Sequence, residues 1–595
     1  MMTSSIAAAS VLIAALGPGA VILSWIDVEE EDRWAVCVAI SLLLAFLASF
    51  FIYLLHVPTT AAWGITAICV VFACFGRNTL FHMLTSPLAK MQAVGLLMII
   101  VNALLLDAAI RNYNGLLWAS DWYEHYQRAL FFIVRPDPTT ARFLEYLPHP
   151  YLLPARPPFM NVIVSHALSH GEPTYAAFQV VSTILSAFAY LPVAALTARL
   201  AAAVGLPKNG ATITAAAMLI LLPSFSQNVT FPWTKLLTAF YVLTALTMLT
   251  RNSTVESLRR VALAGLFLGA GIAVHYSAVV FALPVALMAI WVRRRSPGAL
   301  ITGLTLLGSV AVVLAPWIVY SAAVFGAAAT FGSNTAVVDA AGLGITGNLI
   351  KVVLNIRDTL IPHFLRPRPP FIEELMHQPN ILARIRDWWF APLQVNFPMA
   401  VGTMSQVVIA AGLPFALRSS PSLRRLAQPW LVSLGCAVVL GIAVHGARDT
   451  LGLAHICLQP VILLAAAAAG VLLPCLPVWL RCVAVAGLAW DYLVGVLLQV
   501  WLEMTPVEAV AIASPDGSSS FGNLWGIGGA ATVNAYLKQS GGLVFLGDTI
   551  SRPEWCLTSA ALLGASALVF VALWAWKIDF RRGNVRRACE ATEGT

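Results

Sequence analysis

Hydrophobic residues come in long, nearly unbroken blocks separated by short polar stretches. Most blocks are close to the length that a helix needs to cross the hydrocarbon core of a bilayer, roughly twenty residues. Backbone groups in lipid must find hydrogen bonds within the chain, so helices are the expected element. We predict about fifteen crossings, at residues 5–26, 34–56, 60–76, 91–110, 174–198, 211–226, 232–250, 261–274, 277–292, 299–320, 396–417, 427–444, 452–474, 482–502 and 556–576.

These blocks predict an all-α polytopic membrane protein with about 13–15 transmembrane helices. Three intervals between blocks are longer and more polar, and we expect interfacial helices in them. We divide the chain into N-terminal extra helices at 1–89, a membrane core at 90–475 with external loops 111–173 and 321–395, and a C-terminal part at 476–595 with a small external segment 503–555 and a basic cytoplasmic tail.

Composition agrees with this picture and excludes a soluble domain. The chain is 59% hydrophobic and 10% charged, whereas soluble domains are about 45–50% apolar and about 25% charged. A net charge of +8 could suggest nucleic acid as a partner, but the basic residues sit at the edges of apolar blocks. That placement is typical of cytoplasmic loops beside membrane lipids, and we expect no nucleic-acid partner. The clearest clusters are Arg259-Arg260, Arg293-Arg294-Arg295, Arg424-Arg425, Arg581-Arg582 and Arg586-Arg587.

The same rule gives an orientation. With the basic tail in the cytoplasm of a plasma (inner) membrane protein, the short basic loops fall on the cytoplasmic side and all three long polar intervals fall outside. This requires that 261–292 form a hairpin turning at His275-Tyr276-Ser277, and it puts the acidic run Glu29-Glu30-Glu31 inside. The basic loops are 77–90, 199–210, 251–260, 293–298 and 418–426.

The nine cysteines form no CxxC or Cys/His ligand pattern, and most lie inside apolar blocks, where they serve as small hydrophobic residues. No DxD-type or HExxH-type motif is present. We therefore expect no cofactor and no tightly bound catalytic metal.

The most informative polar segment follows the fourth block, at residues 118–128. If it is helical, four ionisable residues at i, i+3, i+4 and i+7 share one face, and Ser120 is placed to cap the helix. A plainer interpretation is an amphipathic helix on the membrane surface, with this face in water and Trp122, Tyr123 and Tyr126 toward the lipid. The four residues are Asp121, Glu124, His125 and Arg128.

Two further groups fall on the same predicted outer side. Arg156-Pro157-Pro158-Phe159 precedes an apolar stretch and Gly171; its prolines stop one helix and fix the entry into the next, or simply make a rigid loop. Single ionisable residues also lie at outer helix ends, where such residues are costly and are functional candidates, although a lysine can snorkel and a histidine can pack. These are Lys235, His275, Arg448 and His455.

The order of these segments resembles the GT-C superfamily of membrane glycosyltransferases, in particular the branch with protein O-mannosyltransferases and the lipid A aminoarabinose transferase. The matching features are Asp121 opening a long external loop, Arg156-Pro157-Pro158-Phe159 with Gly171 closing it, and a glycine-rich hairpin from Gly265 to Leu283. The resemblance covers roughly residues 90–475. This chain departs from the family in its three preceding helices and in Glu124, which is not adjacent to Asp121 as the second acid of many members is.

The resemblance implies an inverting transfer of a hexosyl or pentosyl group from a polyprenyl-phosphate-linked donor to an acceptor on the extracytoplasmic side: an envelope lipid, glycan or protein. Asp121 would be the general base for the acceptor. A phosphate leaving group needs cations more than a general acid. Substrate-binding roles would then fall to Glu124, His125, Arg128, Arg156, Lys235, His275, Arg448 and His455.

Two other classes of protein share this architecture. A transporter or flippase of a lipid-linked sugar or other amphiphile would also have many helices and few buried charges, but transporters often carry internal repeats and midplane charges, which we do not find. A non-catalytic subunit of an envelope-assembly complex would tolerate the loss of Asp121.

Overall fold

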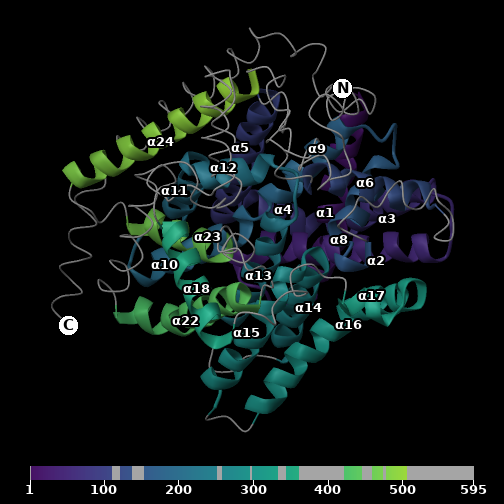
Figure 1. Cartoon of the computed structure of the whole chain (residues 1–595). Coiled ribbons are helices and arrows are strands. Elements are labelled where there is room, and N and C mark those ends of the chain that lie inside the picture. The colour runs from purple at the N-terminus through teal and green to yellow at the C-terminus, as the bar shows by residue number, and fades with distance from the viewer. Residues whose placement is uncertain are drawn as a thin grey trace, which may run out of the picture.

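The computed structural model describes residues 2–109, 121–136, 153–250, 258–294, 298–332, 344–360, 421–444, 459–472 and 478–504. Across these ranges the chain is all-α, with no strand (Figure 1). The predicted fold class is therefore confirmed for the part of the chain that is described.

The first 278 residues hold sixteen of the described elements. They are α1 (Met2–Leu23), η1 (Glu30–Asp32), α2 (Arg33–Leu54), α3 (Ala61–Phe75), α4 (Arg77–Thr85), α5 (Pro87–Ala109), α6 (Asp121–Val134), η2 (Leu153–Ala155), α8 (Phe159–Leu168), α9 (Tyr175–Ala187), α10 (Tyr190–Ala203), α11 (Lys208–Leu221), α12 (Pro223–Thr230), α13 (Lys235–Leu249), α14 (Leu258–Val274) and η3 (Tyr276–Ala278).

The remaining described elements are more widely spaced along the chain. They are α15 (Val279–Val292), α16 (Ala299–Phe325), α17 (Ala327–Gly332), α18 (Gly344–Leu360), α22 (Pro421–Val444), α23 (Gln459–Leu472) and α24 (Val478–Met504). The predicted crossings 396–417 and 556–576 lie outside the described residues.

Five described helices are long and apolar enough to cross a membrane, or six if the bent pair α3–α4 counts as one span. The other described crossings correspond to shorter helices such as α13 and α23. The predicted block 174–198 is two consecutive helices, α9 and α10, in one continuous apolar stretch. The chain is a multi-pass membrane protein, and the total of 13–15 crossings stays a prediction.

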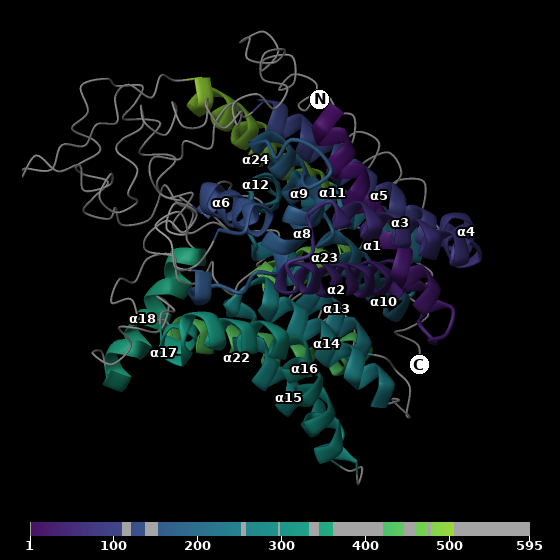
Figure 2. The same cartoon turned by 90° about the vertical axis from the view of Figure 1, so that its right-hand side faces the viewer.

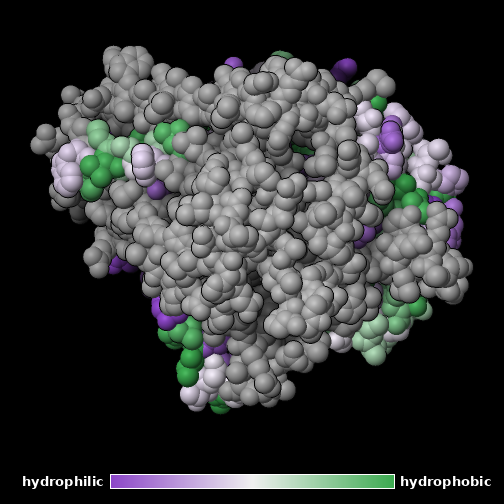
Figure 3. Space-filling view, turned by 45° about the horizontal axis from the view of Figure 1, so that its top comes forward, coloured by the Kyte–Doolittle hydropathy of each residue, from purple (hydrophilic) through white to green (hydrophobic). Residues whose placement is uncertain are grey.

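Burial separates a central layer from a peripheral one. The α9–α10 stretch is entirely covered by its neighbours, whereas only about a quarter of α16 and a third of α5 are covered. The outer helices expose large apolar side chains that would be in lipid, such as Trp291 on α15 and Leu304 on α16. Figure 2 shows α15 and α16 extending from the body. Figure 3 shows hydrophobic surface at the upper left. The helix α24 also exposes large apolar side chains, Trp479 and Trp490 among them.

The helices alternate in direction, which gathers their ends into two groups. Arg199 at the end of α10, Lys208 at the start of α11 and Arg260 at the start of α14 all contact the loop of residues 27–32 before α2. We call this the basic end. Tyr53 at the end of α2 meets Tyr320 near the end of α16, with 2.6 Å between the hydroxyls, at the opposite end.

The hairpin that the predicted orientation requires is present. The chain runs through α14, turns in η3 and returns as α15, and it turns at His275-Tyr276-Ser277 as expected. Glycines let α14 lie very close to α16: a Cβ on Gly265 would come within 2.3 Å of the Leu306 carbonyl oxygen. Small residues allow this kind of close helix packing in membranes.

Candidate functional site

The helix predicted at residues 118–128 exists as α6, which begins at Asp121. Its middle turn is covered on every side, since His125 to Ala129 are all buried, with Arg128 0% and His125 2% exposed. Tyr126, expected to face lipid, donates a hydrogen bond to the Pro173 carbonyl oxygen at 2.6 Å and packs on Tyr175. The plainer interpretation, a surface helix with a wet charged face, is therefore wrong for this turn.

Burial also sets the chemistry of Tyr126. It raises the pKa of the phenol well above its usual value, with the charge of Glu172 as a smaller cause. The hydroxyl is therefore a hydrogen-bond donor at any physiological pH, and it ties α6 to the loop before α9.

The two motif segments that the sequence analysis singled out lie against each other. The prolines end the preceding segment, so α8 begins at Phe159, with the first helical bond from Val162 N–H to the Pro158 carbonyl oxygen at 2.9 Å. Asn161 in the first turn of α8 contacts His125 on α6, with 3.1 Å between Oδ1 and Nδ1. Arg156, just before the prolines, is 8% exposed.

A second polar group forms where α13 begins and α14 ends. The Lys235 ammonium lies 3.1 Å from His275 Nε2, and His275 Nδ1 lies 2.9 Å from Ser277 Oγ. His275 Nδ1 also accepts the Ser277 backbone N–H at 3.1 Å, so the ring caps the turn after α14. Lys235 is 5% exposed, and its ammonium lies 5.6 Å from the centre of the Trp233 ring. Lys235 does not snorkel to the surface.

The helix α8 connects the two groups. It packs against α6 and α14, and Phe159 packs edge-on against Tyr241 of α13, with 5.3 Å between ring centres. Three buried cationic side chains, Arg128, Arg156 and Lys235, therefore lie on α6, just before α8 and on α13, the elements that these contacts join. This arrangement concentrates positive charge at the end opposite the basic loops.

Four of the predicted site residues cannot be placed as side chains. Asp121 and Glu124 lie in the first turn of α6, where only the backbone is described, and Arg448 and His455 lie outside the described residues. In the described parts of the chain, no three His, Cys, Asp or Glu side chains gather as metal ligands would.

One buried acid at this end was not singled out from the sequence. Asp107, near the end of α5, is 3% exposed; it accepts hydrogen bonds from Gln179 at 3.1 Å and from Thr183 at 2.8 Å, both on α9. Its position inside an otherwise apolar block was the available signal, because a carboxylate there is costly without partners. These bonds fix the last turn of α5 to α9.

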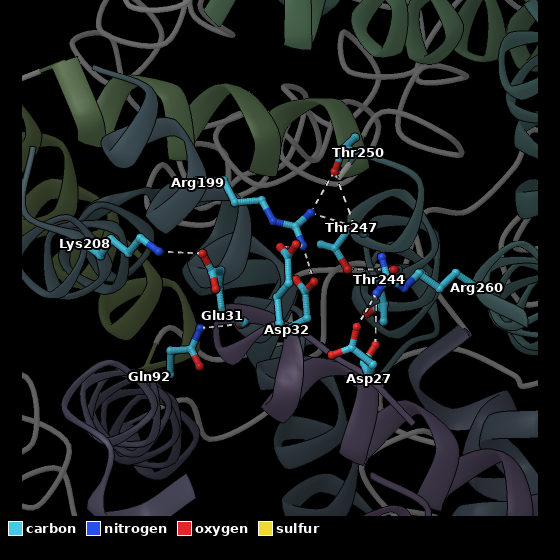
Figure 4. Close-up of polar contacts among 11 residues, drawn as sticks. Asp27, Glu31, Asp32, Gln92, Arg199, Lys208, Thr244, Thr247, Thr250 and Arg260 are labelled. Atoms are coloured by element: carbon cyan, nitrogen blue, oxygen red, sulfur yellow. Dashed lines mark hydrogen bonds and ion pairs between the residues drawn. The ribbon is translucent and has the colours of Figure 1, made fainter. Parts of the chain in front are cut away.

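Figure 4 shows the ion pairs of the basic end. Arg199 bonds both Asp32 and Glu29, and Nη1 of Arg199 donates to the Thr247 carbonyl oxygen at 2.6 Å and to Thr250 Oγ1 at 2.9 Å. Lys208 pairs with Glu31 at 2.8 Å. Every acidic side chain drawn faces a cation from another element, so this cluster joins helices.

The same cluster accounts for the acidic run that the predicted orientation puts inside. Residues 27–32 do not face the basic loops as isolated charges, because Arg260 reaches Asp27 at 2.8 Å and Gln92 donates to the Glu31 carbonyl oxygen at 2.7 Å. Opposite charges on one side of the bundle satisfy each other, and acidic residues have little weight in the positive-inside rule.

No family model and no curated protein matches the chain. Among solved structures, ArnT from Cupriavidus metallidurans bound to undecaprenyl phosphate matches with 17% identity over 80% of this chain and 77% of its own, at a TM-score of 0.41. Archaeal oligosaccharyltransferase AglB from Archaeoglobus fulgidus, in complex with an inhibitory peptide and a dolichol-phosphate, matches with 15% identity over 69% of this chain and 55% of its own, at 0.34. Both are GT-C proteins, the superfamily that the sequence resembles. TM-scores below 0.5 add nothing to the geometry above.

Proposed function

We propose that the protein is a glycosyltransferase that moves a sugar from a polyprenyl-phosphate carrier to an extracytoplasmic acceptor. The observation that carries the proposal is the contact between the two motif segments: His125 in the Asp121 helix meets Asn161, three residues beyond Pro158. Segments separated by 36 residues in the sequence thus form one polar group on α8.

The chemistry of the group suits this reaction. A departing polyprenyl phosphate keeps its negative charge, so catalysis depends on cations and hydrogen-bond donors that stabilise it. Arg128, Arg156 and Lys235 supply positive charge in a buried, low-dielectric setting, where it acts more strongly than in water. His275 orients Lys235, and the opposite end of the bundle carries the basic loops expected in the cytoplasm.

Asp121 is the general base in this scheme. It is the first residue of α6, one helical turn before His125, and its carboxylate would take the proton of the acceptor as the acceptor attacks the anomeric carbon. Attack from the face opposite the phosphate gives inversion. Glu124, Arg448 and His455 are assigned supporting contacts with the substrates.

The test is transfer of labelled sugar from a polyprenyl-phosphate donor in membranes that contain the protein. The native envelope supplies both the donor and the acceptors. The label is measured separately in the lipid, glycan and protein fractions. Labelled product in one fraction, absent with Asp121→Asn at equal expression, is the expected result. Movement of the lipid-linked sugar across the membrane with no transfer in any fraction would overturn the proposal.

A further inference from the structure

A small cavity lies where α2, α3, α6 and α8 meet, at the end opposite the basic loops. Its volume is about 30 Å³, and among its lining residues are Ser49, Tyr53, Arg135 and His166. That is room for about two water molecules or one hydroxymethyl group. A sugar ring does not fit this volume, so the cavity cannot hold the transferred sugar.

The His166 ring presents an unmatched hydrogen-bond acceptor. His170 Nδ1 lies 2.9 Å from the His166 carbonyl oxygen and must donate to it, so His170 Nε2 accepts the Thr66 hydroxyl proton at 2.9 Å. The Thr66 oxygen then accepts from His166 Nε2–H at 3.2 Å. This leaves Nδ1 of His166 as a hydrogen-bond acceptor that has no partner among the described residues. The residue His166 is 3% exposed.

A second buried polar atom on the same cavity is also unmatched. Ser49 Oγ, on α2, has no hydrogen-bond partner within the described ranges, and the residue is 9% exposed. Buried polar atoms are nearly always hydrogen-bonded in folded proteins. Two exceptions from different helices on one cavity point to a polar guest.

Arg135 adds a positive charge. It follows the last turn of α6 and is partly exposed; its Nη1 donates to the Val57 carbonyl oxygen, and its guanidinium lies 5.8 Å from the centre of the Tyr53 ring. The Tyr53 hydroxyl is held by Tyr320. The guest therefore meets a cation, a hydroxyl and a neutral imidazole that needs a donor.

The surroundings indicate where the guest comes from. The helix α3 borders the cavity and exposes a row of large apolar side chains, including Ile68 at 55% and Val71 at 51%. Trp63, at 53%, packs edge-on against His170, with 4.6 Å between ring centres. Because α3 contributes Ala62 and Ile65 to the cavity and exposes this apolar row, we take the bilayer as the source of the guest.

We propose that this cavity binds the headgroup of an anionic glycerophospholipid that ends in a free hydroxyl, as phosphatidylglycerol does. The phosphodiester lies against Arg135, and the terminal hydroxymethyl group enters the cavity. Its hydroxyl donates to His166 Nδ1 and accepts from Ser49. The lipid is a bound ligand that joins α2, α3, α6 and α8, and it takes no part in sugar transfer.

The experiment compares two lipids on the purified full-length protein in detergent. Phosphatidylethanol carries the same phosphodiester charge as phosphatidylglycerol but lacks the hydroxyls. Affinities from native mass spectrometry should differ about tenfold in favour of phosphatidylglycerol, the size expected for one or two hydrogen bonds. Equal affinity of the two lipids would overturn the proposal. So would the absence of detectable binding of either lipid.

Variants assign the difference to the cavity. Ser49→Ala and His166→Gln, which keeps a polar group toward Thr66, should each reduce the preference to about threefold or less, while Arg135→Gln weakens both lipids. Ser186→Ala is the matched control, because Ser186 Oγ is also buried without a partner in the described residues but lies on α9, away from the cavity. If glycerol 1-phosphate or inorganic phosphate bound as tightly as phosphatidylglycerol, the cavity would be a site for free anions. That result would overturn the proposal that its ligand is a lipid.

Discussion

The Lys235 ammonium lies 3.1 Å from His275 Nε2, and this contact joins the start of α13 to the turn after α14. Both side chains are buried, and the other ring nitrogen of His275, Nδ1, accepts the Ser277 backbone N–H at 3.1 Å. The imidazole holds the ammonium in place without neutralising its charge, which is the arrangement that a site for an anionic phosphate requires.

Lys235→Met, which keeps the length of the side chain and removes the charge, should weaken use of the donor. We expect KM for the polyprenyl-phosphate sugar to rise at least tenfold, since a hydrogen bond to a charged group contributes about 1.5–3 kcal/mol. His275→Gln, which retains an acceptor, should cost less than His275→Ala. Lys208→Met, at the basic end, is the control and should leave KM unchanged; an equal effect there would remove Lys235 from the site.

Asp121→Asn should nearly abolish turnover while the protein still inserts and folds. General-base assistance accounts for roughly a hundredfold to ten-thousandfold in rate, and the amide keeps the size and polarity of the side chain. Glu124→Gln should cost less, because it lies one turn away from Asp121. The measurement is kcat in membranes normalised to protein level, and full activity of Asp121→Asn would transfer the role of base to Glu124.

Arg199→Met should destabilise the fold far more than Arg260→Gln. Asp32 is almost fully buried, so without Arg199 its charge loses its main partner, and breaking a buried ion pair costs about 3–5 kcal/mol. Asp27 is 82% exposed, and an exposed pair contributes about 0–1 kcal/mol. Thermal unfolding in detergent measures both; adding Asp32→Asn to Arg199→Met should recover part of the loss, and no recovery would argue against the pair.

Stability should fall as the solution is acidified below about pH 6.5. Burial lowers the pKa of His166 from 6.5 to about 3, with the charge of His170 as a smaller cause, and burial also lowers the pKa of His170. The unfolded chain therefore binds more protons between these pH values, so the free energy of unfolding rises with pH by up to about 1.4 kcal/mol per unit for each group. His166→Gln should flatten the melting temperature plotted against pH, and an unchanged slope would contradict this.

The two ends of the bundle should label from opposite sides of the membrane. Glu172 before α9 and Asn209 in α11 are both exposed and flank the α9–α10 stretch. A membrane-impermeant thiol reagent applied to intact cells should modify Glu172→Cys directly and Asn209→Cys only after permeabilisation. The reverse labelling pattern would invert the proposed orientation. It would also contradict the proposal that the transfer site lies on the extracytoplasmic side.

The helices could be predicted because lipid imposes a simple rule on sequence: a segment that crosses it is apolar and satisfies its own backbone. That rule located α1, α2, α5 and the α14–α15 hairpin to within a few residues. It could not locate α8, because this helix is only ten residues long and lies inside an interval that is polar on average.

The candidate site was harder to predict for a different reason. Helical periodicity places Asp121, Glu124, His125 and Arg128 on one face, but it does not reveal what covers that face. The cover is α8, and its contact is made by Asn161, a residue with no periodic signal of its own. The partners of residues 27–32 were equally hidden, because an ion pair between distant segments leaves no trace in the local sequence.

The ion pairs of the basic end also impose an order on biosynthesis. Asp32 and Arg199 are 167 positions apart, so the acidic loop leaves the ribosome well before its partner. At about 5–20 residues per second, the loop waits roughly ten to thirty seconds in water before α10 arrives. The first two helices therefore enter the membrane with their connecting charges unmatched, and their final docking is a late event, completed only when α10 delivers Arg199.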